Sequence, residues 1–221
     1  MRTAMELTLF TLLHLLVFVY WLGGDVGVFY ASTLLTDDKR DAAGRLAAGK
    51  IVADVDLAPR FCLLLALPTG LALAAVKGWV QIDAVWLVAA FIAAFAWIYL
   101  VVQLHIRHAG MEAMKRLDTV LRALFLAGLA IAGIGGLIGV FSIPLFVSLK
   151  LLILAFAVLM GLLVRIALAP FGAAYVALAT NGPDPDTDRI IKTSLNRARP
   201  AVVMIWLALL LAAWLGLATP I

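Results

Sequence analysis

Two ionisable side chains, His14 and Asp25, lie inside a long apolar run near the start of the chain. An ionisable group in a membrane-spanning helix is costly to place there, so its presence indicates a functional site. Imidazole is a common ligand of iron and copper, and a carboxyl group can carry a proton. The other ionisable residues that we consider, because they stand in or beside apolar segments, are His105, His108, Lys150 and Arg165.

His14 and Asp25 share one face of a helix, together with Phe18 and Trp21. Eleven residues at about 100° each bring a helix to within roughly 20° of its starting direction. This face should point into a bundle, because the alternative places both ionisable groups in lipid. His14, Phe18 and Trp21 are therefore candidates for binding a cofactor. The same eleven residues rise roughly 16 Å, so Asp25 lies at a different depth from His14.

The composition excludes a soluble globular protein. The 221 residues are 65% hydrophobic and only 14% charged, and the mean hydropathy is +1.11. Such values are typical of an integral membrane protein, and they leave little chain for a separate soluble domain. We therefore treat residues 1–221 as one membrane domain.

The elements that must position these residues are membrane-spanning helices of about 20 residues each. The sequence predicts an all-α polytopic helix bundle with about six such spans. The polar segment 36–57 is predicted to be an amphipathic cytoplasmic connection lying on the membrane surface, and residues 181–199 a polar cytoplasmic loop. The predicted spans are residues 7–32, 60–78, 84–106, 119–140, 143–168 and 200–218.

The basic residues concentrate in segments 36–57, 107–118 and 181–199 and beside them. Positive charge is retained on the cytoplasmic side, so both termini should be periplasmic in the inner membrane of a bacterial cell. The pI of about 9.5 then reflects orientation in the bilayer and not nucleic-acid binding. Gly128, Ala132 and Gly136 form a ridge of small residues, which suits either bundle packing or a homo-oligomer interface.

A second candidate site lies near the cytoplasmic edge. With the N-terminus outside, Asp25, Arg60 and His105 fall at similar depth and form a candidate catalytic cluster, with His108 beside it. Two simpler interpretations remain open. Asp25 and Arg60 could form an ion pair that only joins two helices, and the two histidines could be headgroup-level residues.

Several motifs resemble those of the HemJ-type protoporphyrinogen oxidases and the related CopD-like membrane proteins. His14, Trp21 and Gly23 match the pattern H-x6-W-x-G of the first helix in that family. The stretch "APRFCLLLALPTGLALA" is similar to its second helix, through Pro59 and the pair Thr69–Gly70. The resemblance implies a helical bundle that holds heme b, with His14 as axial ligand and redox chemistry on a tetrapyrrole or quinone. The HemJ-type enzymes carry a Lys after a Trp in the third helix, where this chain has "WIYLVVQ", so the resemblance favours heme binding over that particular substrate.

Three functions remain open from the sequence. The first is a heme-b redox protein that exchanges electrons with quinone, a tetrapyrrole or a partner protein. The second is transport of copper, another metal or a solute, with His14, His105 and His108 as ligands, and the third is a purely structural role. His14 and His105 should differ in depth by roughly 15 Å, too much for one iron to bridge. A second heme ligand would then be absent, or would be a methionine such as Met160 or Met204.

Overall fold

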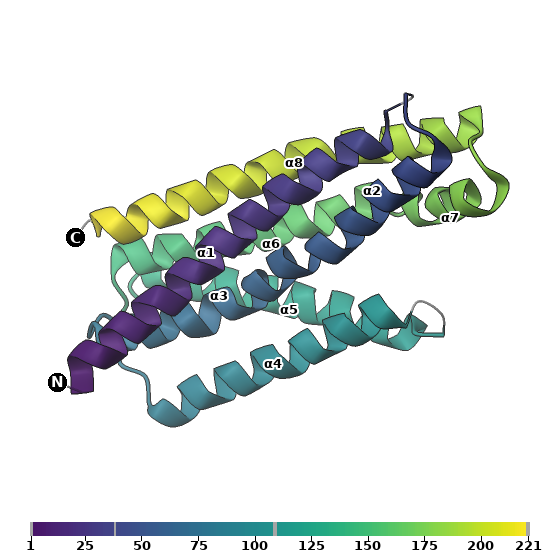
Figure 1. Ribbon diagram of the computed structural model, residues 1–221. Helices are drawn as coiled ribbons and strands as arrows, with labels where there is room; N and C mark the ends of the chain where they lie inside the picture. Colours follow the sequence, from purple (N-terminus) through teal and green to yellow (C-terminus); the bar gives the residue numbers. More distant parts are fainter. Residues whose placement is uncertain (1, 38, 108–109, 220–221) are drawn as a thin grey trace.

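The computed structural model describes residues 2–37, 39–107 and 110–219, and this part of the chain is all-α (Figure 1). His108 lies outside the described residues. The helices are α1 (Arg2–Leu35), α2 (Ala42–Val55), α3 (Leu57–Val76), α4 (Ala84–Ile106), α5 (Glu112–Leu137), α6 (Leu145–Ala167), α7 (Phe171–Asn181) and α8 (Pro185–Ala218).

Six helical segments of the described chain are long and apolar enough to cross a membrane, which confirms the predicted polytopic bundle. They correspond to α1, α2 continued by α3, α4, α5, α6 and α8. Many large apolar side chains face outwards, for example Ile92 at 64% and Ile131 at 65% exposure. Such an apolar exterior suits lipid and not water, so the chain is a multi-pass membrane protein.

The described ends of α1 and α8 lie at the same end of the bundle, which we call the terminal end (Figure 1). The other end carries the α1–α2 connection and α7, and we call it the opposite end. The predicted periplasmic location of the termini remains a prediction. The most extensive packing joins α6 to α8, α1 to α3 and α5 to α6. Helix α4 lies at the side, with only Ala94 and Val101 buried.

Helices α1 and α8 have 34 residues each, about 50 Å of helix against a hydrocarbon thickness of about 30 Å. Both helices therefore exceed the hydrocarbon thickness, and at the opposite end they pack with α2 and α7. Helix starts there are specified by polar caps. Asp41 accepts a hydrogen bond from the Gly44 amide at 2.9 Å, and Asp184 accepts from the amides of Asp186 and Thr187 at 3.1 Å each.

The two polar segments differ from their predicted form. Residues 42–55 form α2, which does not lie flat but continues along the direction of α3 and packs on α1 and α7 (Figure 1). Residues 185–199 are the first part of α8 and not a loop. Both segments are helical because they bury a second apolar core, which the unpredicted α7 completes. That core consists of Leu35, Ala48, Ala174, Leu178, Ile191 and Leu195.

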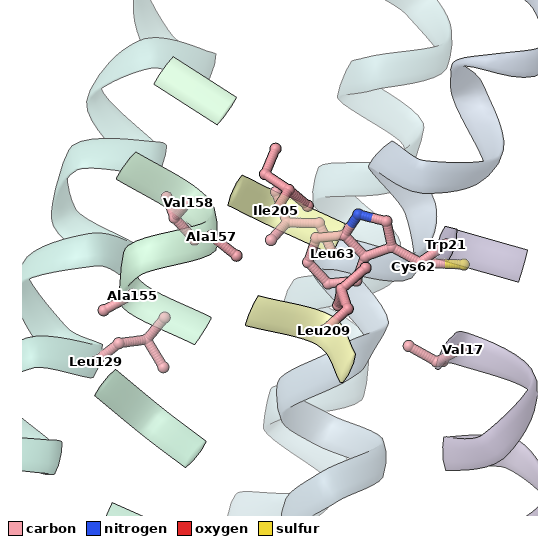
Figure 2. Packing of buried hydrophobic residues seen from close by; sticks show 10 residues of the cluster. All are labelled: Val17, Trp21, Cys62, Leu63, Leu129, Ala155, Ala157, Val158, Ile205 and Leu209. Carbon is pink, nitrogen blue, oxygen red and sulfur yellow. The ribbon is translucent and has the colours of Figure 1, made fainter. Parts of the chain in front are cut away.

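The main core lies between α1, α3, α5, α6 and α8 (Figure 2). Its buried side chains include Trp21, which is 4% exposed, and Cys62, the only cysteine of the chain. The α1–α3 contact is close because Gly24 has no side chain. A Cβ atom there would lie 2.7 Å from Cδ of Pro59. This contact fixes α1 so that the face carrying His14 and Trp21 points inwards.

One end of the predicted ridge Gly128–Ala132–Gly136 packs against another helix of the same chain. A Cβ atom at Gly136 would overlap Ser148 and Ile143, so this glycine allows α5 to approach the start of α6. A Cβ atom at Gly128 would meet no neighbouring side chain within 4 Å, because this glycine faces outwards. A homo-oligomer interface at the outer part of the ridge remains a prediction.

Candidate cofactor cavity and buried polar clusters

A cavity of about 380 Å³ lies between α1, α3, α6 and α8 at the terminal end of the bundle. We call it the His14 cavity. Its walls are mainly apolar, and all three predicted cofactor-binding residues, His14, Phe18 and Trp21, line it. Ligand sites are typically apolar pockets of about 300–1,000 Å³ with a few placed polar groups, so this cavity has the size and character of such a site.

The hydrogen bonds around His14 favour one tautomer of its imidazole. Nδ1 of the imidazole lies 3.0 Å from Oγ1 of Thr69. The Thr69 hydroxyl donates to the Leu65 carbonyl at 2.6 Å, the shorter of its two contacts, which leaves its oxygen to accept a hydrogen bond from the N–H of Nδ1. In a neutral imidazole the second nitrogen, Nε2, then carries the lone pair, and it has no hydrogen-bond partner in the described chain. This is the form in which a histidine binds a metal.

Gly70 lets the imidazole lie directly against α3. A Cβ atom at this position would be 3.2 Å from Cε1 of His14, tighter than ordinary side-chain contacts. Thr69 therefore supplies the hydrogen bond and Gly70 supplies the space. Thr69 and Gly70, the pair that resembles the second helix of the HemJ-type family, both contact His14 of α1.

Two lysines give the cavity a positive wall. Lys150 on α6 and Lys77 after α3 both line it, and neither has a carboxylate within 4.0 Å among the described residues. Lys77 lies 4.5 Å from the centre of the Trp79 ring. Lys150 reaches α8 at Gly216, where a Cβ atom would be 2.8 Å from the ammonium nitrogen. The cavity thus presents one imidazole and two lysine side chains.

The methionines considered as second ligands do not reach this cavity. Met160 packs at the edge of the main core and is not among the lining residues. Met204 is 41% exposed. Within the described chain, His14 is the only histidine, cysteine or methionine that lines the cavity.

In the structure, Arg60 and His105 pair with acidic residues of segment 36–57 and not with Asp25. Arg60 forms an ion pair with Asp56, and Nε2 of His105 lies 3.3 Å from Oδ1 of Asp54. Both partners come from the polar segment at α2, whose upright packing was not foreseen. Asp25 forms no ion pair within the described chain, and its Oδ2 atom is buried without a hydrogen-bond partner.

A polar cluster that sequence reasoning missed joins α4, α5 and α6. Asp118 is fully buried, and we call its group the Asp118 cluster. It accepts hydrogen bonds from Nε1 of Trp97 at 2.8 Å and from Nε of Arg122 at 3.1 Å. Nη1 of Arg165 lies 2.7 Å from its Oδ2 atom. Asp118 and Arg122 stand four residues apart before an apolar run, and that spacing was the available signal.

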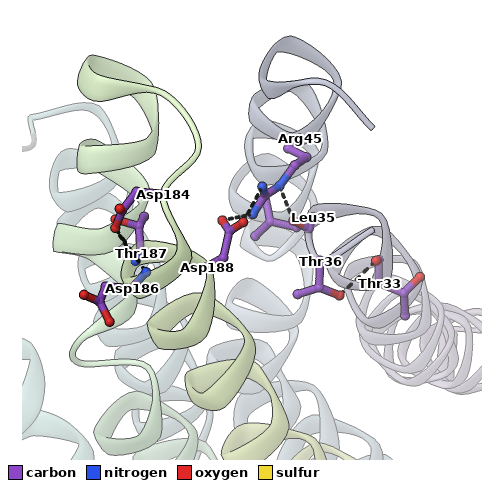
Figure 3. A network of polar contacts seen from close by, with 8 residues as sticks. All are labelled: Thr33, Leu35, Thr36, Arg45, Asp184, Asp186, Thr187 and Asp188. Atoms are coloured by element: carbon purple, nitrogen blue, oxygen red, sulfur yellow. Dashed lines mark hydrogen bonds and ion pairs between the residues drawn. The ribbon is translucent and has the colours of Figure 1, made fainter. Parts of the chain in front are cut away.

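A third group of polar contacts is centred on Arg45 and joins helices α1, α2 and α8 (Figure 3). Arg45 on α2 is 4% exposed. Its Nε donates to the Leu35 carbonyl at 2.9 Å, and both terminal nitrogens bind Asp188 of α8. One side chain thereby caps the end of α1 and ties three helices together.

No family model matches the chain, and no curated protein or solved structure is significantly similar to it.

Proposed function

We propose that this protein is a heme-b-binding membrane redox protein of the HemJ/CopD-like type, with Nε2 of His14 as the axial ligand. The observation that carries the proposal is the imidazole itself. Its Nδ1 proton is committed to Thr69, and its Nε2 lone pair has no partner among the described residues and lies beside an apolar cavity. A neutral histidine arranged in this way is ready to bind a metal without losing a proton.

The residues of the cavity fit the rest of a heme group. Phe18 and Trp21 offer flat apolar surface for a macrocycle, while Lys150 and Lys77 can pair with two carboxylates. When bound, heme supplies one-electron redox chemistry whose potential depends on ligand, burial and nearby charge. The chain holds the imidazole in one orientation, excludes water with its apolar wall and places positive charge at one edge.

Metal-ion transport is supported less well by these residues. A copper path needs several soft or imidazole ligands, and among the described residues the cavity offers one imidazole with two lysines. The described chain contains no group of three or more His, Cys, Asp or Glu side chains arranged to hold a metal ion. Two ammonium groups also repel a free cation.

The redox partner in this proposal is a membrane quinone, a tetrapyrrole or a protein that docks at the terminal end. The cavity lies at that end, which the positive-inside rule makes periplasmic in a bacterial inner membrane. Electrons would enter or leave there or through the lipid-facing side of the bundle.

The test is the heme content of the purified protein after expression with ample heme. We expect a stoichiometric pigment in the wild type and its loss in His14→Ala. The matched control is His105→Ala, because His105 lies outside the cavity and pairs with Asp54. Equal heme content in the wild type and in folded His14→Ala would overturn the assignment of the ligand.

A further inference from the structure

The Asp118 cluster is separate from the His14 cavity, because none of its residues lines that cavity. It consists of Asp118 with Trp97, Arg122 and Arg165, and it joins three helices. Asp118 is 0% exposed and Arg122 is 5% exposed. The proposed redox function uses none of these four residues.

The charges of the cluster do not balance. Two guanidinium groups, those of Arg122 and Arg165, share the single carboxylate of Asp118. A third cation, Arg60, lies close enough to act electrostatically on Arg165, and its own charge is already matched by Asp56. Among the described residues, the cluster therefore keeps one positive charge without an anionic partner, next to an apolar interior where such a charge is costly.

One donor in the cluster also lacks an acceptor. The Nη2 atom of Arg122 is buried and has no hydrogen-bond partner in the described chain. A buried charged donor without an acceptor is among the more expensive defects in a fold. Arg165, whose side chain is 36% exposed, gives the same cluster an accessible edge. An anion at that edge would neutralise the excess charge.

The level of the cluster in the bundle indicates what kind of anion can reach it. Arg165 lies near the end of α6 and Arg60 near the start of α3. Arg122 lies in the third turn of α5. All three therefore stand toward the opposite end, where the apolar spans give way to the polar connections. Phosphate groups of lipids occupy this level of a bilayer, and basic pockets between helices bind anionic headgroups there.

We propose that the Asp118 cluster is a binding site for a phosphate group, held by Arg165 at its accessible edge. Arg122 supplies the uncompensated charge behind it, and Arg60 adds to the field. Guanidinium groups bind phosphate oxygens through paired, charge-assisted hydrogen bonds. The phosphate can belong to an anionic phospholipid or be a free anion, and the experiment separates the two.

The test measures thermal unfolding of the purified full chain in detergent with three additions. These are phosphatidylglycerol, phosphatidylcholine and inorganic phosphate, the last against chloride at equal ionic strength. A ligand that binds only the folded state raises the unfolding temperature. We expect phosphatidylglycerol to raise it more than phosphatidylcholine does.

The decisive variant is Arg165→Gln, because Asp118 then keeps Arg122 and Trp97 as partners and the fold is retained. We expect its apparent affinity for phosphatidylglycerol to fall about tenfold or more, as for loss of one charged hydrogen-bond donor. The control Arg189→Gln makes the same charge change on an exposed pair with Asp186 and should bind as the wild type does. Arg165→Lys, which keeps the charge but loses the paired donors, should bind with intermediate affinity and provides a second test if Arg165→Gln is not isolated.

If inorganic phosphate raises the unfolding temperature of the wild type but not that of Arg165→Gln, the site exists and binds a soluble anion. Stabilisation by phosphatidylglycerol alone supports a lipid headgroup. The proposal is overturned if neither addition stabilises the wild type, or if Arg165→Gln and Arg165→Lys respond as Arg189→Gln does.

Discussion

The hydrogen bond between Thr69 and His14 gives the sharpest prediction about the cavity. Thr69→Val removes the oxygen that is hydrogen-bonded to Nδ1 of His14 and replaces it with a methyl group of similar size. Thr69 is 3% exposed, so water cannot easily take the place of the hydroxyl. The imidazole is then free to change tautomer or to rotate away from the cavity.

The expected loss of heme affinity in Thr69→Val follows from two independent free-energy ranges. Loss of a residue that orients a metal-binding histidine typically lowers metal affinity by about 10–100-fold, which corresponds to about 1.4–2.8 kcal/mol. A buried donor left without its acceptor costs about 1–3 kcal/mol. The two ranges agree, so we expect heme affinity in Thr69→Val to fall by about 10–100-fold.

The assay is titration of heme into the apoprotein, followed by the visible absorbance. The matched control is Thr119→Val, because the Thr119 hydroxyl also donates to the carbonyl four residues earlier, at 3.0 Å, but is exposed on α5. It should bind heme as the wild type does. If Thr69→Val also binds with wild-type affinity while His14→Ala does not, the tautomer argument is refuted even though the ligand assignment stands.

Three further changes test the cavity and the buried ion pairs. Gly70→Ala places a methyl group 3.2 Å from Cε1 of the imidazole and should weaken heme binding. The control Gly161→Ala meets no neighbouring atom within 4 Å and should leave heme binding unchanged. Equal heme titration curves for the two variants would contradict this prediction. Lys150→Met removes a cation from the cavity wall and should lower the midpoint potential in a spectroelectrochemical titration, because nearby positive charge favours the reduced state. An unchanged or raised potential would argue against a heme beside this lysine. Asp118→Ala strips two guanidinium groups of their carboxylate and should lower the free energy of unfolding in mixed micelles by about 3–5 kcal/mol. The exposed Asp186→Ala should cost no more than about 0.5 kcal/mol, and similar losses in both variants would contradict the role of the cluster.

Much of the fold could be predicted from hydropathy, because lipid demands about 20 apolar residues per span. The bounds of α4 match the predicted 84–106. Prediction was weakest where the chain leaves the membrane. Residues 42–55 and 185–199 are polar enough to suggest a surface helix and a loop, yet Ala48, Ile191 and Leu195 are buried in a second core. That core depends on α7, whose packing cannot be seen in a local window of sequence.

The candidate site was predicted in part by helical periodicity. His14, Phe18 and Trp21 line one cavity, as expected of residues on one face of one helix. Depth alone was a poor guide to which residues from different helices meet. Arg60 and His105 bind Asp56 and Asp54, since these carboxylates stand at the same level on a segment that was expected to lie flat.

The Asp118 cluster was missed for a related reason. Asp118 ends a short basic segment that suggests a connection between spans, but α5 begins earlier, at Glu112, and carries Asp118 into the bundle. The indole of Trp97 then supplies a donor from a helix without internal charge. A tryptophan in an apolar run gives no sign in the sequence that its nitrogen will meet a buried carboxylate.

In the proposed function, His14 holds a heme through Nε2, and no other histidine, cysteine or methionine of the described chain lines the cavity. The most direct test is the absorbance spectrum of the purified protein when oxidised, when reduced with dithionite, and when reduced under carbon monoxide. We predict a Soret band, a change on reduction, and a further shift with carbon monoxide, because no second histidine, cysteine or methionine of the described chain lines the cavity. A flat visible spectrum after expression with ample heme would rule out the proposed heme binding.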